Sequence, residues 1–393
     1  VIRRYLKQFL LTLLAGLFLL SCFFISPEKA SDSILHGILA FPFLRYFPLE
    51  NFSFLATVLI LTSFLLHTPI LFYFTYPLLR FCKTRRGLAL SLIAVSFLLA
   101  LFFGTSVSLY FTLPLCMGTL GKEEESPFLF IHCFCLQILA AEMGSILFPF
   151  TSLSEFYLFL QYNYSFPEYF RISFLFFLFA ILFLLPYALC FQKEENHALS
   201  FAVQERLEIS YSALQGKDFK KTWRSTLPFL IFVLLLFLSI LRVFPIFLCF
   251  LLLLLYSLLF NRDIFRKVDY FLLVFLVLLF FIRGNLFTMH KIPNLLSRFI
   301  QGRETSRALI LSTFFTRLPT TVLLADISTK GRQLIISSIL SALHPLALNY
   351  SGVIAYTMMK NRPHWKVFLL HYLFLHIQML LLFVFLAFFT GNL

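Results

Sequence analysis

An uncharged apolar run fills residues 88–117, LALSLIAVSFLLALFFGTSVSLYFTLPLCM. A helix needs about 20 apolar residues to cross the hydrocarbon core of a bilayer, so this run is long enough to span it. The polar triplet GTS at 104–106 interrupts the run, and Pro114 follows. Such an interruption predicts a helix that breaks inside the membrane, where its freed backbone groups can bind ions if they line a cavity.

Similar apolar runs recur along the whole chain. They are Phe9–Ile25, Phe52–Leu79, Phe170–Phe191, Leu227–Leu241, Phe244–Phe260, Tyr270–Ile282 and Val367–Phe389. Charged residues make up 13% of the 393 residues, against about a quarter in a soluble globular protein. A soluble fold of this length cannot bury so much apolar surface. The sequence therefore predicts an all-α polytopic membrane protein whose main partner is the lipid bilayer.

Basic residues in the short loops predict the orientation, because cytoplasmic loops are enriched in lysine and arginine. Arg3, Arg4 and Lys7 precede the first run and place the N-terminus in the cytoplasm. The uncharged end of the last run places the C-terminus outside. We predict about eleven transmembrane helices in a bacterial cytoplasmic (inner) membrane. A cleaved signal peptide is the alternative for the first run, but the many later spans favour an uncleaved helix.

The polar segment 192–224 divides the apolar chain into two parts of similar size. We predict an N-terminal transmembrane helix at 1–30, a first transmembrane repeat at 31–191, a polar inter-repeat linker at 192–224 and a second repeat at 225–393. Both repeats contain a similar pattern, FFGTS at 102–106 and FFTR at 314–317, each followed by a proline. Broken helices at matching places in two halves indicate a transport site.

Ionisable residues inside apolar runs are costly and so indicate function. Glu142 and Arg317 are the leading candidates. A weaker group consists of Glu155, Asp326, His67, His132, His344, His371 and His376. Each of these has a structural alternative, which is a side chain at the membrane interface or one hydrogen-bonded within the helix bundle. A helix N-terminus beside Arg317 would favour an anion.

Several function classes are excluded by what the sequence lacks. It contains no phosphate-binding Gly-Lys-Ser/Thr loop, no Gly-x-Ser-x-Gly elbow and no His-Glu-x-x-His motif. Cys133 and Cys135 have no further cysteine or histidine at zinc spacing. The chain has a net charge of +14, but its lysine and arginine residues lie in short loops between apolar runs. This placement argues against a protein that binds nucleic acid. We expect a protein that is not an enzyme and needs no metal or cofactor.

Four segments together resemble the ion transporter superfamily, which includes arsenite permeases, sodium/proton antiporters, and citrate and dicarboxylate carriers. The similarity is closest to its bacterial permeases of unassigned substrate. The segments are FFGTSVSLYFTLP at 102–114, LQILAAEMGSILFP at 136–149 with TS at 151–152, VDY at 268–270 through FIRGN at 281–285, and FTRLPTTVLL at 315–324. The resemblance implies two inverted repeats, two re-entrant helical hairpins, a midplane site, an elevator-like motion and a homodimer.

The chain departs from the family pattern at the hairpins and near the helix breaks. It has Thr105-Ser106 in place of Asn-Asp, Glu142 in place of Asn, and Thr151-Ser152 in place of Gly-Asn. Thr316-Arg317 replaces Ser-Asn. The predicted substrate- or ion-binding residues are Thr105, Ser106, Glu142, Thr151, Ser152, Asn285, Thr316 and Arg317.

We expect Glu142 and Arg317 to face one cavity and to pair there, because opposite charges reduce each other's desolvation cost. Glu142 would then be a proton-coupling group. The function expected is secondary transport of a small anion or organic acid, coupled to protons or as a uniporter. The loss of family asparagines argues against sodium as the coupling ion. The alternatives are a cation/proton antiporter and a membrane scaffold that keeps the fold without transport.

Overall fold

A computed structural model describes residues 49–67, 70–122, 127–189, 219–260, 262–268, 270–288, 291–345 and 350–391. Every regular element in these ranges is a helix, which confirms the predicted all-α class. The longer helices are α4 (Leu49–His67), α5 (Ile70–Arg80), α6 (Arg85–Thr119), α7 (Pro127–Gly144), α8 (Leu153–Gln161), α9 (Phe166–Leu189), α11 (Phe219–Ile240), α12 (Ile246–Phe260), α14 (Tyr270–Thr288), α15 (Lys291–Ile300), α16 (Glu304–Phe315), α17 (Arg317–Leu324), α18 (Gly331–Ala342), α19 (Tyr350–Met359) and α20 (Trp365–Phe389). The short ones are η2 (Leu120–Lys122), η3 (Pro149–Thr151) and α13 (Arg262–Arg266).

The predicted N-terminal helix at 1–30 lies outside the described residues, as does most of the predicted linker at 192–224. The helix α11 begins at Phe219, so the last residues of that linker segment are helical.

Five described helices are long and apolar enough to cross a membrane, namely α4, α6, α7, α9 and α20. The helices α14 and α15 count as a sixth span if they form one broken helix, bent by 99°. Shorter apolar helices occur at Leu227–Ile240 and Ile246–Phe260. These helices indicate a multi-pass membrane protein. The total of about eleven crossings stays a prediction, because 1–48 and 190–218 lie outside the described residues.

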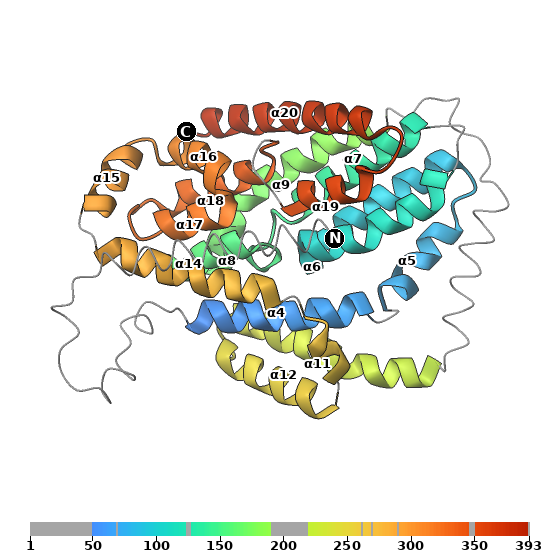
Figure 1. Cartoon of the computed structure of the whole chain (residues 1–393), viewed down its shortest axis with the longest axis horizontal. Helices are drawn as coiled ribbons and strands as arrows, with labels where there is room; N and C mark the ends of the chain where they lie inside the picture. The colour runs from blue at the N-terminus through green and yellow to red at the C-terminus, as the bar shows by residue number, and fades with distance from the viewer. Residues whose placement is uncertain are drawn as a thin grey trace.

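The helices differ in how far they are enclosed. Of the 18-residue apolar stretch in α7, 89% is buried inside the protein, whereas the buried share of the corresponding stretch is 39% in α9 and in α20. Along α20 the exposed side chains Leu370, Phe374, Leu381 and Phe385 recur at helical spacing and so share one face. Figure 1 shows α20 along one edge of the molecule. A continuous apolar face of this kind is typical of contact with lipid.

The helix α6 reverses direction at Gly104. The hydroxyl groups of Ser96 and Ser108 lie 2.9 Å apart, and the Ser108 hydroxyl donates to the Ser96 carbonyl oxygen at 2.7 Å. In a straight helix these two residues would be about 18 Å apart. The segments 85–103 and 105–119 are therefore two arms that lie side by side (Figure 1). The reversal falls at the polar triplet that interrupts the apolar run.

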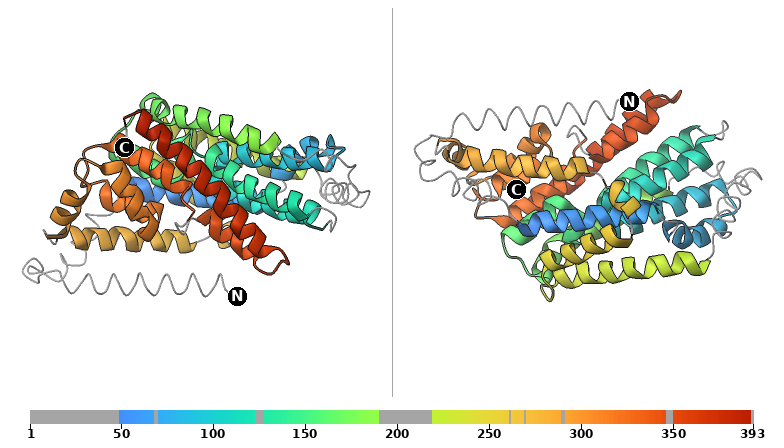
Figure 2. Two further views of the ribbon diagram at one scale, coloured as in Figure 1. Left: turned by 90° about the horizontal axis from the view of Figure 1, so that it is seen from above. Right: turned by 60° about the horizontal axis from the view of Figure 1, so that its bottom comes forward.

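A second break with the same backbone conformation separates α16 from α17. Gly104 has φ 84° and ψ 165°, and Thr316 has φ 65° and ψ 169°. Only glycine adopts this region without strain. The helix α7 ends at Gly144, and its connection to α8 contains the short helix η3. The helix α18 ends at Ala342. Figure 2 shows the C-terminal helices packed across the first half of the chain.

Candidate functional site

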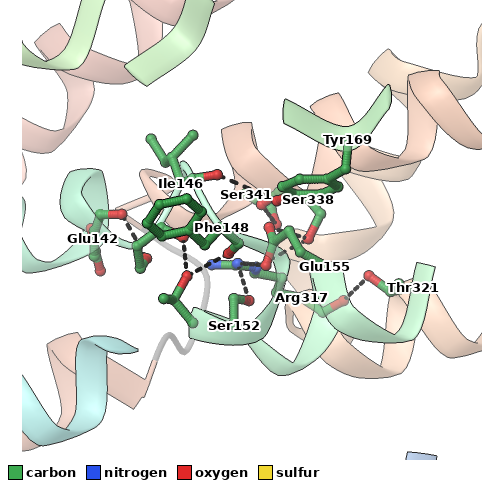
Figure 3. Close-up of polar contacts among 12 residues, drawn as sticks. Glu142, Ile146, Phe148, Ser152, Glu155, Tyr169, Arg317, Thr321, Ser338 and Ser341 are labelled. Carbon is green, nitrogen blue, oxygen red and sulfur yellow. Dashed lines mark hydrogen bonds and ion pairs between the residues drawn. The ribbon is translucent and has the colours of Figure 1, made fainter. Parts of the chain in front are cut away.

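A buried ion pair joins Arg317, the first residue of α17, to Glu155 in the first turn of α8. The side chains are 18% and 1% exposed. The guanidinium also donates to the hydroxyl of Ser152. The Ser338 hydroxyl in α18 accepts from Arg317 Nε at 3.1 Å and donates to Glu155 Oε1 at 2.9 Å. Figure 3 shows the guanidinium pointing towards Ser152 and Glu155. The pair therefore links α8, α17 and α18.

A small cavity lies beside Arg317 and has room for about one water molecule. Its lining consists mainly of hydroxyl groups with a few apolar side chains. The lining residues are Ala308, Ser312, Arg317, Thr320, Thr321, Leu324, Leu334, Ser337, Ser338 and Ser341. Among the side chains that the structure describes, Thr320 Oγ1 is buried without a hydrogen-bond partner. Hydroxyl and guanidinium donors around one space are suited to a small anion.

A second buried carboxyl group, Glu142 near the end of α7, has different partners, a serine and a histidine. The Ser351 hydroxyl of α19 donates to Glu142 Oε1. The Nε2 atom of His376 in α20 lies 3.1 Å from Glu142 Oε2, and both side chains are almost fully buried. His376 Nδ1 lies 2.9 Å from the carbonyl oxygen of Tyr372. Glu142 is thus enclosed by α19 and α20.

The expected pairing of Glu142 with Arg317 is wrong. Figure 3 shows Glu142 apart from the guanidinium, which binds Glu155 instead. The physical reason is the connection after Gly144, which separates α7 from α8. Glu155 follows this connection and meets the start of α17, whereas Glu142 precedes it and faces α19 and α20.

The two carboxylate centres are built alike. Glu142 in α7 accepts from Ser351 in α19, and Glu155 in α8 accepts from Ser338 in α18. The number of residues between Glu142 and Ser338 equals the number between Glu155 and Ser351. The two contacts therefore join positions that are related by one interval in the sequence, with glutamate and serine exchanged.

Neighbouring residues repeat the correspondence. The Ser145 hydroxyl donates to the carbonyl oxygen of Glu142 at 2.8 Å, and the Ser341 hydroxyl donates to that of Ser338 at 2.9 Å. Tyr169 in α9 interacts electrostatically with Glu155, and Tyr372 in α20 does so with Glu142. Figure 3 shows Tyr169 beside Glu155. The equal interval thus also relates Ser145 to Ser341, whereas Tyr169 and Tyr372 are separated by a different interval.

Most of the other predicted site residues lie close to the two breaks. Thr105 and Ser106 are partly exposed and follow Gly104 directly. The Thr151 hydroxyl donates to the carbonyl oxygens of Ser145 and Phe148, both at 2.6 Å. Thr151 therefore closes the connection between α7 and α8. Thr316 provides the break before α17, and its side chain makes no capping hydrogen bond there.

Asn285 lies elsewhere, buried in α14. Its neighbour Arg283 pairs with Asp326, which also accepts from Gln161 Nε2 at 2.7 Å. Asn285 has interactions of its own, and the side-chain hydrogen bonds of Arg317 and Glu142 described above go to other residues. Of the predicted residues, the structure brings together Ser152 and Arg317, while Glu142 forms its own centre.

Two residues of the two centres, Glu155 and His376, belong to the weaker group of sequence candidates. The sequence did not indicate Ser338, Ser351, Tyr169 and Tyr372. Another pair from that group, His132 and His371, lies with Nδ1 and Nε2 2.7 Å apart. Within the described ranges, no three histidine, cysteine, aspartate or glutamate residues could hold a metal ion.

No family model and no curated protein matches this chain. The resemblance to the ion transporter superfamily therefore stays a prediction, and the geometry of the two centres is the basis for a functional proposal.

Proposed function

We propose that this protein is a secondary carrier that moves a small anion or organic acid across the membrane together with protons. The observation that carries this proposal is the buried Arg317–Glu155 pair, which sits at a broken helix beside a hydroxyl-lined cavity. In transporters, broken helices near the midplane commonly form the substrate site. The cavity holds one water-sized group, so the α16–α17 hairpin must move to admit a larger substrate.

The ion pair supplies the coupling to protons. While Glu155 is ionised, it neutralises Arg317, and an anion at the guanidinium would meet a second negative charge. Protonation of Glu155 removes that charge and leaves Arg317 free to bind the anion. Because linkage is reciprocal, a bound anion also favours proton uptake by Glu155. One proton and one negative charge would therefore enter the site together.

The fold that accompanies this function consists of two inverted repeats, each with one re-entrant hairpin. Gly104 and Thr316 mark the hairpin tips. Two halves related by a two-fold axis make each contact between different positions twice, once in each direction. The Glu142–Ser351 and Ser338–Glu155 contacts are reciprocal in this way. The further features that we propose are a bacterial inner-membrane location, a cytoplasmic N-terminus, an outside C-terminus and a homodimer.

Anion binding to the purified protein in detergent tests the function. Chloride, nitrate, phosphate, acetate and succinate are added at pH 5.5 and pH 8, and thermal unfolding is recorded. A ligand at 100 times its Kd stabilises the folded state by about 2.7 kcal/mol. We expect one or more of these anions to raise the Tm more at pH 5.5 than at pH 8.

Glu155→Gln is the variant that distinguishes proton-coupled anion binding from electrostatic attraction of the anion to Arg317 alone. It removes the carboxylate that competes with the anion, so the rise in Tm is expected to be equal at both pH values. Arg317→Met is expected to abolish the rise. Folded protein that responds to none of these anions at either pH would contradict the proposal.

A cation/proton antiporter is the second candidate, because both buried acids, Glu142 and Glu155, could release protons in exchange for a cation. Glu155 already has the guanidinium of Arg317 beside it, which disfavours cation entry there. Glu142 already has His376 beside it. A rise in Tm with sodium or potassium in place of anions would favour this candidate. Folded protein that responds to neither class would favour a scaffold without transport.

A further inference from the structure

The hydrogen bonds of His376 fix where its protons are. His376 Nδ1 faces the carbonyl oxygen of Tyr372 at 2.9 Å, and a carbonyl oxygen can only accept. Nδ1 therefore carries a proton. On the other side of the ring, Nε2 lies 3.1 Å from Glu142 Oε2. A hydrogen bond across this gap needs one more proton, on either the imidazole or the carboxyl group.

Among the residues that the structure describes, no other charged side chain contacts Glu142 or His376. From α19, Ser351 contributes a neutral hydroxyl that donates to Glu142. From α20, Tyr372 is the titratable neighbour besides His376. From α9, Tyr169 lies near Glu155 instead. The helix α6 brings Ser96 to the Gln137 carbonyl oxygen, two helical turns before the end of α7. Among the described residues, the charges at Glu142 are thus its own and that of His376.

Loss of the shared proton would leave one uncompensated negative charge where both side chains are almost fully buried. Such a charge is strongly unfavourable away from water. The corresponding Glu155 centre differs in this respect, because the guanidinium of Arg317 is always charged. One centre is therefore neutralised by a permanent cation and the other by an exchangeable proton.

We infer that Glu142 and His376 hold one exchangeable proton between them and form a second proton-binding site, separate from the Arg317 centre. The pair releases this proton only when α19 or α20 moves and water reaches the carboxylate. Because Ser351 and His376 come from the C-terminal part and Glu142 from α7, relative motion of these helices would open the site. This inference rests on the geometry of the pair and does not require that an anion be carried.

The test is the pH dependence of stability without added anions. Equilibrium unfolding in mixed micelles is measured from pH 7 to pH 9 for the wild-type protein and Glu142→Gln. In water, an unfolded glutamate holds no proton in this range, and an unfolded histidine, with a pKa of about 6.5, holds a fraction that falls towards zero and is the same in both proteins. The folded state then holds one proton more than the unfolded state, so stability falls as pH rises.

We expect the unfolding constant of the wild-type protein, divided by that of Glu142→Gln, to increase tenfold per pH unit. The glutamine amide can donate to His376 and accept from Ser351, so this variant keeps the contacts without the titrating proton. Glu155→Gln is the matched control and should follow the wild-type pH dependence. A constant ratio from pH 7 to pH 9 would overturn the inference.

If Glu142→Gln does not fold, the exchange Glu142→Ser with Ser351→Glu serves instead. It keeps one carboxyl group in the same buried gap and is therefore expected to retain the wild-type pH dependence. A folded exchange variant whose stability no longer falls between pH 7 and pH 9 would equally overturn the inference. Neither outcome depends on anion binding, so failure here and failure of the carrier proposal can be told apart.

Discussion

Arg317→Met is expected to lower the free energy of unfolding by about 3–5 kcal/mol, which is the usual effect of removing one partner of a buried ion pair. The loss arises because Glu155, with a side chain only 1% exposed, is left without a counterion and pays either for a buried charge or for uptake of a proton. The Ser338 hydroxyl alone cannot replace the guanidinium. Equilibrium unfolding in mixed micelles at pH 8, where an unpaired carboxyl group is most costly, measures the change.

A second substitution tests this explanation. Glu155→Gln, added to Arg317→Met, removes the buried charge and is expected to recover most of the lost stability. Arg266→Met is the matched control, because Arg266 and Asp263 form an ion pair that is largely exposed to solvent, and exposed pairs contribute little. If the double variant is as unstable as Arg317→Met, the charge of Glu155 is not the cause.

The all-α class and the first helix break could be predicted because both depend on local sequence. Apolar runs long enough to span a bilayer leave few alternatives to helices. The triplet at 104–106 interrupts such a run, and its glycine tolerates the backbone conformation that the reversal needs. The start of α17 was marked in the same way by a polar pair, Thr316-Arg317, between apolar residues.

The partners of the charged residues could not be predicted in the same way, because they depend on how distant helices pack. Glu155 follows Thr151 and Ser152, so it reads as a residue near a membrane interface, yet it is buried against Arg317. The sequence predicts that Glu142 meets Arg317, because opposite charges inside the membrane reduce each other's desolvation cost. The connection between α7 and α8 puts Glu155 in that place and leaves Glu142 to His376.

One signal in the sequence could have identified both centres. Gln137, Ser145 and Pro149 recur at equal spacing as Gln333, Ser341 and Pro345. The same spacing aligns Ser338 with Glu142 and Ser351 with Glu155 in the sequence. Serine is too common in membrane helices to attract attention alone, so the match becomes informative only when the contacts of both pairs are seen together.

Gly104→Ala is expected to destabilise the protein by about 2–6 kcal/mol. The backbone at Gly104, with φ 84° and ψ 165°, costs a residue with a side chain about 1–3 kcal/mol. A Cβ atom there would also lie 2.6 Å from the carbonyl oxygen of Thr151, and overpacking of this kind costs about 1–3 kcal/mol. Thermal and equilibrium unfolding of the variant in detergent measure the combined effect.

Thr316→Gly is the matched substitution at the second break, and its expected effect has the opposite sign. Thr316 holds nearly the same backbone conformation with φ 65° and ψ 169°, but it carries a side chain, so it is strained by about 1–3 kcal/mol. Glycine relieves this strain and costs about 0.5–1 kcal/mol in chain entropy. The net result is a stabilisation of about 1 kcal/mol, measured in the same unfolding experiment. If Thr316→Gly destabilises as much as Gly104→Ala, the two breaks do not share one backbone requirement, and the likeness between the two hairpins fails at their tips.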